Sequence, residues 1–189
     1  DGVWTYWNKK GEKDFDFDFG SGLEHISLED LVERDAVFYK LGNDETPFTG
    51  IITQENPDAD YLFLGRTKDG KKDGQWVKWF PSGKDVPEIV LVEVPVPEPK
   101  LPWSGGKQEQ GGYKDGKKHG DWTEWYDNEH IKSHGTYDLG IMNGHWTFYH
   151  KNGVKEKEGD LNSGNANGTW MFWDDESNKV QEGTFSNGI

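Results

Sequence analysis

Residues 111–126 read GGYKDGKKHGDWTEWY, and this stretch decides the fold because its pattern recurs along the chain. Trp122 is followed by Trp146 and then by Trp170, each 24 residues after the one before. Glycines stand two, six and eleven residues before each of these tryptophans. Self-similarity at a fixed period of this length is typical of repeat proteins, in which neighbouring units stack to bury one continuous core.

A second aromatic ring follows each of these tryptophans by three positions, and the set is Trp125, Tyr149 and Trp173. The same frame fits two earlier pairs of rings, Trp4 with Trp7 and Trp76 with Trp79. Nine of the ten tryptophans therefore occupy one of two ring positions, which chance does not arrange. Rings three apart point to opposite faces of a regular strand, unless a bulge or a strong twist brings them together. The sequence leaves this choice open.

Each repeat is predicted to form a β-hairpin. The run from Trp122 to Tyr126 is aromatic and β-branched, as strands are, and a second short strand is expected over Ile131–Tyr137. In the next repeat, Asn152-Gly153 is a strong signal for a hairpin turn. Because a lone hairpin is marginally stable in water, the units must stack. We therefore predict an all-β fold, an antiparallel hairpin array that forms an elongated or rolled single sheet.

Charge and proline content divide the chain into three parts. The net charge is −14, and the first 60 residues carry 15 acidic and only 5 basic side chains. Prolines alternate with other residues over Pro95–Pro102, as in a stiff extended linker. We predict irregular acidic N-terminal repeats over residues 1–95, a Pro/Gly-rich linker over 96–110 and regular 24-residue repeats over 111–189.

The alternation of Asp and Phe over Asp14–Phe19 predicts an amphipathic strand. Its three aspartates resemble the start of a calcium loop, but Phe19 and His25 stand where such a loop needs Gly and Glu. We therefore assign no metal site there.

Two further segments of the N-terminal part allow specific expectations. Ser27–Asp30 has the pattern of a capped short helix, and the alternative for this part of the chain is a pair of strands over Leu31–Tyr39. The run Pro47-Phe48-Thr49-Gly50 resembles a modified repeat, with Phe48 expected in the place of the tryptophan.

Catalytic and metal-binding motifs are missing from the sequence. There is no cysteine, and no nucleophile or zinc motif is present. His119 and His145 occupy positions where the other repeats carry varied polar residues, which is typical of surface histidines. We therefore expect no catalytic residue, no metal and no cofactor, and we predict that the chain is not an enzyme. A hydrolase with an unrecognised pair of carboxylates is the enzymatic alternative.

The recurring rings are the candidate binding residues, and they are Trp122, Trp125, Trp146, Tyr149, Trp170 and Trp173. Aromatic rings on a sheet either pack as core between stacked hairpins, which is the interpretation we favour, or present a surface to sugars or to a partner protein.

Charge and hydropathy also exclude some partners. The acidic balance repels phosphate backbones, and no apolar run is long enough to cross a bilayer. We therefore expect neither nucleic-acid binding nor membrane insertion. The sequence begins at Asp1 rather than at Met, so a processed chain that is secreted or held in the cell envelope is favoured over a cytoplasmic one.

The unit from Tyr113 to Tyr126 resembles the bacterial variant of the MORN repeat, and the resemblance covers Gly65–Gly83 and Gly111–Gly188, with residues 1–11 in part. It implies a hairpin-repeat fold, protein scaffolding and, in some cases, contact with phospholipid. Proteins of this kind are often catalogued as YwqK-type antitoxins, which implies binding to a protein toxin. The leading hypothesis is thus a non-enzymatic module that binds or scaffolds a protein, with an antitoxin as one specific form. The alternative is carbohydrate or cell-envelope binding through exposed aromatics.

Overall fold

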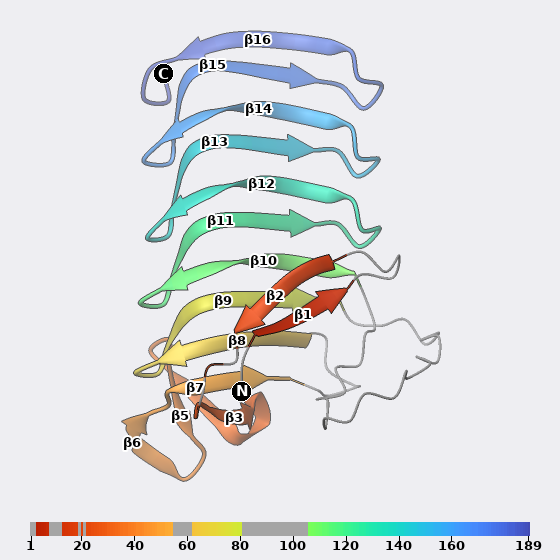
Figure 1. Cartoon of the computed structure of the whole chain (residues 1–189). Helices are drawn as coiled ribbons and strands as arrows, with labels where there is room; N and C mark the ends of the chain where they lie inside the picture. The colour runs from red at the N-terminus through yellow and green to blue at the C-terminus, as the bar shows by residue number, and fades with distance from the viewer. Residues whose placement is uncertain (1–2, 8–12, 19, 21, 55–61, 81–105) are drawn as a thin grey trace.

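The regular structure of this chain is almost entirely β. The computed structural model describes residues 3–7, 13–18, 20, 22–54, 62–80 and 106–189. Eleven of the described strands form one open sheet, shown as a stack of rungs in Figure 1. In sheet order they are β3 (Glu24–Ser27), β7 (Gly50–Thr53), β8 (Leu62–Lys68), β9 (Lys71–Trp79), β10 (Lys107–Lys114), β11 (Lys117–Trp125), β12 (Ile131–Asp138), β13 (Ile141–Tyr149), β14 (Lys155–Asn162), β15 (Asn165–Trp173) and β16 (Lys179–Phe185).

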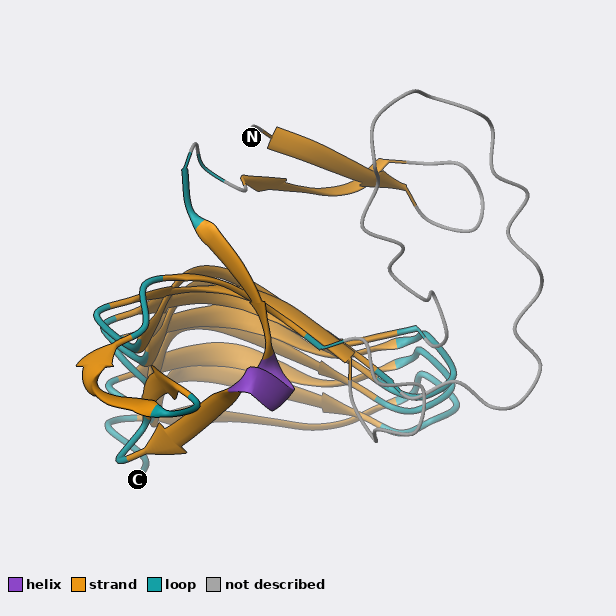
Figure 2. Ribbon diagram, turned by 90° about the horizontal axis from the view of Figure 1, so that it is seen from below, coloured by secondary structure: helices purple, strands orange, loops and turns teal. Residues whose placement is uncertain are grey.

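Successive strands from β7 onward pair antiparallel, and only β3 and β7 run parallel. The predicted antiparallel meander of hairpins is therefore confirmed, and it is a single open sheet. Seen along the stack in Figure 2, the strands of the long sheet are curved.

Two kinds of turn alternate along the two edges of the stack. Asp115 and Gly116 connect β10 to β11 with φ values of 50° and 80°, as a two-residue hairpin turn with a left-handed backbone requires. The turn predicted at Asn152-Gly153 lies between β13 and β14. There the Asn152 side chain accepts a hydrogen bond from the Val154 amide at 3.0 Å and donates one to the Asp175 carbonyl at 2.8 Å.

Turns on one edge of the sheet are also hydrogen-bonded to the preceding repeat. The amide of Gly140 donates to the Lys118 carbonyl at 2.7 Å, and the amide of Gly164 donates to the Met142 carbonyl at 2.9 Å. Each of these bonds joins a turn to the corresponding strand of the preceding repeat. These hydrogen bonds therefore hold neighbouring repeats in register at the edge of the sheet.

Within the long sheet, the repeat begins at β7, before the first tryptophan strand β9, but not in the register that we expected. Ile52 pairs with Gly65 just as Trp122 pairs with Gly135, so Ile52, not Phe48, stands in the tryptophan place. Phe48 lies four residues earlier, where its carbonyl accepts the turn bond from Gly70 at 2.9 Å. The expectation for Phe48 was wrong because an aliphatic residue replaces the tryptophan in this unit.

A small second layer covers the first repeats. It consists of the 3₁₀ helix η1 (Leu28–Asp30) and a three-stranded antiparallel sheet of β4 (Leu31–Arg34), β5 (Val37–Lys40) and β6 (Asn43–Pro47). The strand pair, one of the two alternatives for this part of the chain, is present, and η1 is a single 3₁₀ turn without a cap hydrogen bond from the Ser27 side chain. Phe38 on β5 stacks on Trp76 with ring centroids 6.5 Å apart, and Phe48 and Ile52 complete this core. In Figure 2, η1 lies on the inner side of the curved strands.

The remaining two strands form a separate hairpin. β1 (Val3–Trp7) pairs antiparallel with β2 (Lys13–Asp18), which confirms the strand predicted from the alternating aspartates and phenylalanines. Most of the linker predicted over residues 96–110 lies outside the described residues. Residues 107–110 form the start of β10, and β10 pairs directly with β9.

Candidate functional site

The four tryptophans Trp76, Trp122, Trp146 and Trp170 define one face of the sheet, called here the tryptophan face. Each indole lies flat over a glycine on the preceding strand, where a Cβ would overlap the ring. Each Nε1 also donates to the carbonyl of the residue after that glycine, as from Trp122 to Gly112 at 2.9 Å and from Trp170 to Asp160 at 3.0 Å. The glycine eleven residues before each tryptophan is therefore its seat.

This packing buries the tryptophans almost completely. Trp122 and Trp146 are each 2% exposed, and Trp170 is 6% exposed. Tyr113 and Tyr137 fill the gaps between them with edge-on contacts, and the Tyr113 and Trp122 ring centroids are 5.2 Å apart. Burial raises the pKa of both phenols above the ordinary value. Three of the six candidate binding residues, Trp122, Trp146 and Trp170, thus lie in the core of the sheet.

The other three candidates, Trp125, Tyr149 and Trp173, lie on the other side of the sheet, called here the opposite face. Side chains alternate along β11, and Asp121, Thr123 and Trp125 line one shallow depression together. The irregularity in pairing near Trp125 places the extra residue, Lys132, on the neighbouring strand, so β11 itself stays regular here. Rings three apart therefore face opposite ways, which answers the question that the sequence left open.

The rings of the opposite face are half-buried rather than enclosed. Lys107 lies over the Trp125 ring with its Nζ 4.8 Å from the centroid, and Lys155 lies over Trp173 at 5.0 Å. Each of these lysines also bonds to the residue three positions on, Gln110 at 2.9 Å and Glu158 at 2.7 Å. The faces of these two rings are thus partly occupied by lysine ammonium groups.

Polar side chains accompany this row on the opposite face. Thr123 hydrogen-bonds with the Nδ1 of His134 at 3.0 Å. His145 lies 2.9 Å from an Asp160 carboxylate oxygen through Nδ1 and 3.7 Å from Glu158 through Nε2. The side chains of His145 and Asp160 are 58% and 65% exposed, so these groups are available to a partner.

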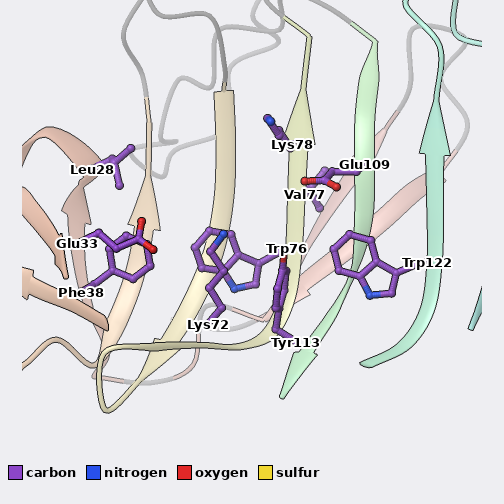
Figure 3. A pocket seen from close by; sticks show the side chains of 10 residues that line it. All are labelled: Leu28, Glu33, Phe38, Lys72, Trp76, Val77, Lys78, Glu109, Tyr113 and Trp122. Carbon is purple, nitrogen blue, oxygen red and sulfur yellow. The ribbon is translucent and has the colours of Figure 1, made fainter. Parts of the chain in front are cut away.

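A cavity of about 240 Å³ lies where the small second layer meets the repeats (Figure 3). The aromatic and aliphatic part of its lining is Leu28, Phe38, Trp76, Val77, Tyr113 and Trp122. Lys72 lines it too, with its Nζ 4.6 Å from the Trp76 centroid and 5.2 Å from that of Tyr113. Burial lowers the pKa of Lys72, while the carboxylates of Glu33 and Glu109 oppose this shift.

No local sequence pattern indicates this cavity. Glu33 and Phe38 belong to the small layer, and their approach to Trp76 depends on contacts between segments that are distant in the chain. Lys72 occupies the same place in its repeat as Lys118, whose Nζ lies 3.9 Å from the Trp122 centroid. A lysine at this position is therefore a regular feature of the repeat and does not by itself indicate a cavity.

Metal-binding and membrane-spanning features are absent from the part of the chain that the structure describes. No cluster of three or more His, Asp or Glu side chains is placed to hold a metal ion among those residues. The described residues also include no helix with the length and apolar character needed to cross a bilayer.

Residues 118–139 and 142–162 each match the MORN repeat variant. These two stretches are similar to MORN repeats. Each matched stretch holds a tryptophan strand and the return strand that follows it, β11 with β12 and β13 with β14. MORN repeats are in general modules that bind proteins or membrane lipids, and they are not typically catalytic. A search of curated proteins found no match to this chain.

Proposed function

We propose that these repeats form a non-enzymatic module that binds a protein partner through the opposite face of the sheet. The observation that carries this proposal is the row of half-buried rings at Trp125, Tyr149 and Trp173, which remains accessible after the tryptophan face has been used for packing. Trp and Tyr are the residues that most often dominate the energy of protein interfaces. One return strand lies between successive rings, so the rings are two strand spacings apart, which is about 10 Å.

The charge of the chain supports a partner with a basic surface. The net charge is −14, and carboxylates such as Asp160 and Glu182 stand beside the ring row. Complementary charge speeds association and sets orientation, and it does so less as salt rises. The same charge weighs against the anionic membrane surfaces that some MORN repeats contact.

A MORN-type antitoxin is one specific form of this proposal, supported by the resemblance of the repeat unit alone. In that form the partner is a protein toxin, and one equivalent of the chain would abolish its activity.

The test is affinity capture with three immobilised versions of the chain: the natural sequence, Tyr149→Ala and Leu139→Ser. Leu139 is 45% exposed at a turn and serves as the control. The captured protein is identified, purified and titrated by calorimetry. We expect Tyr149→Ala to weaken binding at least tenfold, the size of a moderate interface hot spot, while Leu139→Ser binds as the natural chain does.

Three results would count against the proposal. Equal binding by all three versions would remove the opposite face from the interface. Retention of polysaccharide in place of a protein would favour the carbohydrate alternative, and retention of anionic vesicles would favour a lipid-binding module.

A further inference from the structure

The cavity between the small second layer and the repeats holds two side chains of opposite charge that are not paired with each other. Lys72 reaches it from β9 and Glu33 reaches it from β4, so each layer supplies one charge (Figure 3). Among the described residues, neither side chain forms an ion pair or a hydrogen bond. The two groups are nevertheless close, because the field of the Glu33 carboxylate raises the pKa of Lys72 while burial lowers it.

The repeat pattern explains why Lys72 has no carboxylate partner. Lys72 and Lys118 are each the second residue of a nine-residue tryptophan strand, β9 and β11. The eighth residue of β11 is Glu124, and its carboxylate lies 3.6 Å from the Lys118 ammonium. The eighth residue of β9 is Lys78, so a second cation stands where the neutralising carboxylate is found in the next repeat. The cavity therefore keeps a positive charge that the neighbouring unit cancels.

The rest of the lining favours a small molecule with a ring. Glu109, the other carboxylate in the lining, is already paired with Lys118 at 3.2 Å. Leu28 and Tyr113 are only half-buried, so they present apolar surface that no other side chain covers fully. The volume of about 240 Å³ is below the roughly 300–1,000 Å³ of pockets for drug-sized ligands. One ring with a short charged chain suits this space.

We propose that the cavity binds a small aromatic zwitterion, that is, a free aromatic amino acid. Its carboxylate lies on the Lys72 ammonium, its ammonium on the Glu33 carboxylate, and its ring against Leu28 and Tyr113. A ligand carboxylate replaces the water that burial removes from Lys72, and hydrogen bonds between charged groups are the stronger kind. A ligand with one charge leaves Lys72 or Glu33 without a partner. This site is on the tryptophan face, so it does not rest on the proposed function, which uses the opposite face.

The probes are L-phenylalanine and L-tryptophan, each titrated into the isotope-labelled chain and followed by NMR. We expect saturable shifts of the indole Nε1–H signals of Trp76 and Trp122, which line the cavity, and none for Trp170. Three analogues each lack one part of the ligand: phenylpropionate has no ammonium, phenylethylamine has no carboxylate, and glycine has no ring. Each should bind about tenfold more weakly or worse, as the loss of a hydrogen bond to a charged group predicts for the first two.

Two variants assign the charges to their partners. Lys72→Met removes the ammonium but keeps an apolar chain over Trp76, so it should weaken L-phenylalanine about tenfold and leave phenylethylamine unchanged. Glu33→Gln should weaken L-phenylalanine and leave phenylpropionate unchanged. Lys157→Met is the matched control, because it removes a lysine from over Phe148, outside the cavity, and it should bind as the natural chain does. Circular dichroism checks that all three variants are folded.

Several results would overturn this proposal. Binding of phenylpropionate as tight as that of L-phenylalanine would show a site for acids without a role for Glu33. Equal binding of L-phenylalanine by the natural chain and by Lys72→Met would remove the carboxylate contact. The absence of saturable shifts at Trp76 with either amino acid would remove the site itself. None of these results bears on partner capture or on its sensitivity to Tyr149→Ala, so the two proposals fail separately.

Discussion

Replacing Gly159 by alanine tests the central packing relation of this sheet. A Cβ at Gly159 would lie 2.5 Å from Cγ and from Cδ2 of Trp170, whereas carbon atoms in contact prefer about 3.5–4.0 Å. The indole must therefore lift by about 1 Å, and its 3.0 Å hydrogen bond to the Asp160 carbonyl is strained or lost. Overpacking of this kind costs about 1–3 kcal/mol, and the lost bond adds about 1 kcal/mol.

We therefore expect Gly159→Ala to lower the free energy of unfolding by about 2–4 kcal/mol, a large share of a domain's usual 5–15 kcal/mol. The assay is urea denaturation followed by tryptophan fluorescence and by circular dichroism. Gly183→Ala is the matched control, because a Cβ at Gly183 meets nothing nearer than the Phe185 ring at 3.7 Å. It should be neutral or stabilising by about 0.5–1 kcal/mol, since alanine is less flexible than glycine in a strand. Equal losses in the two variants would refute the idea that glycine is kept as the seat of an indole.

Three further predictions concern single side chains. In an alkaline titration followed by tyrosinate absorbance, Tyr113 and Tyr137 should ionise above the ordinary tyrosine pKa, because burial raises the pKa of each. Tyr113→Phe should remove part of this late phase. The free energy of unfolding should fall as pH rises above the tyrosine pKa of the unfolded chain, because only the unfolded chain then ionises readily. The pKa of Asp174 is lowered by hydrogen bonds from the side chain and amide of Asn178, so its contribution is present above the ordinary aspartate pKa and is lost as pH falls through the folded one. The midpoint difference in urea between the natural chain and Asp174→Asn should accordingly shrink with acidification, and a constant difference would contradict this. Trp146→Phe loses the 3.1 Å bond from Nε1 and leaves space over its glycine, so it should cost about 1–3 kcal/mol in the same denaturation assay.

The repeat could be predicted from the sequence because its signals are local. Trp122, Trp146 and Trp170 at equal spacing establish the hairpins, and the turn at Asn152-Gly153 marks where one strand ends. The faces could not be assigned in the same way, because the extra residue near Trp125 lies on the next strand, and its place depends on how the two strands pair.

Other features of the fold lacked any local signal. In the unit that ends at β7, Ile52 replaces the tryptophan. The aromatic Phe48 was therefore expected in the tryptophan position, although it lies four residues before it. The cavity depends on Phe38 meeting Trp76, which is a contact between segments that no repeat pattern relates. Tyr149 was among the expected binding residues. The sequence did not show that its half-buried ring lies on the other face of the sheet from the buried tryptophans.

Each repeat carries both a glycine that receives a ring and a tryptophan that covers the glycine before it. A duplication or deletion of 24 residues within the regular repeats would therefore leave the glycines that now lie under an indole still matched to a tryptophan, with the turn bonds such as Gly140 to Lys118 re-formed in the same pattern. No compensating change elsewhere in the sheet is needed. A gene that encodes such an array can change the length of the protein by unequal recombination, and natural variation in length should occur in steps of whole repeats.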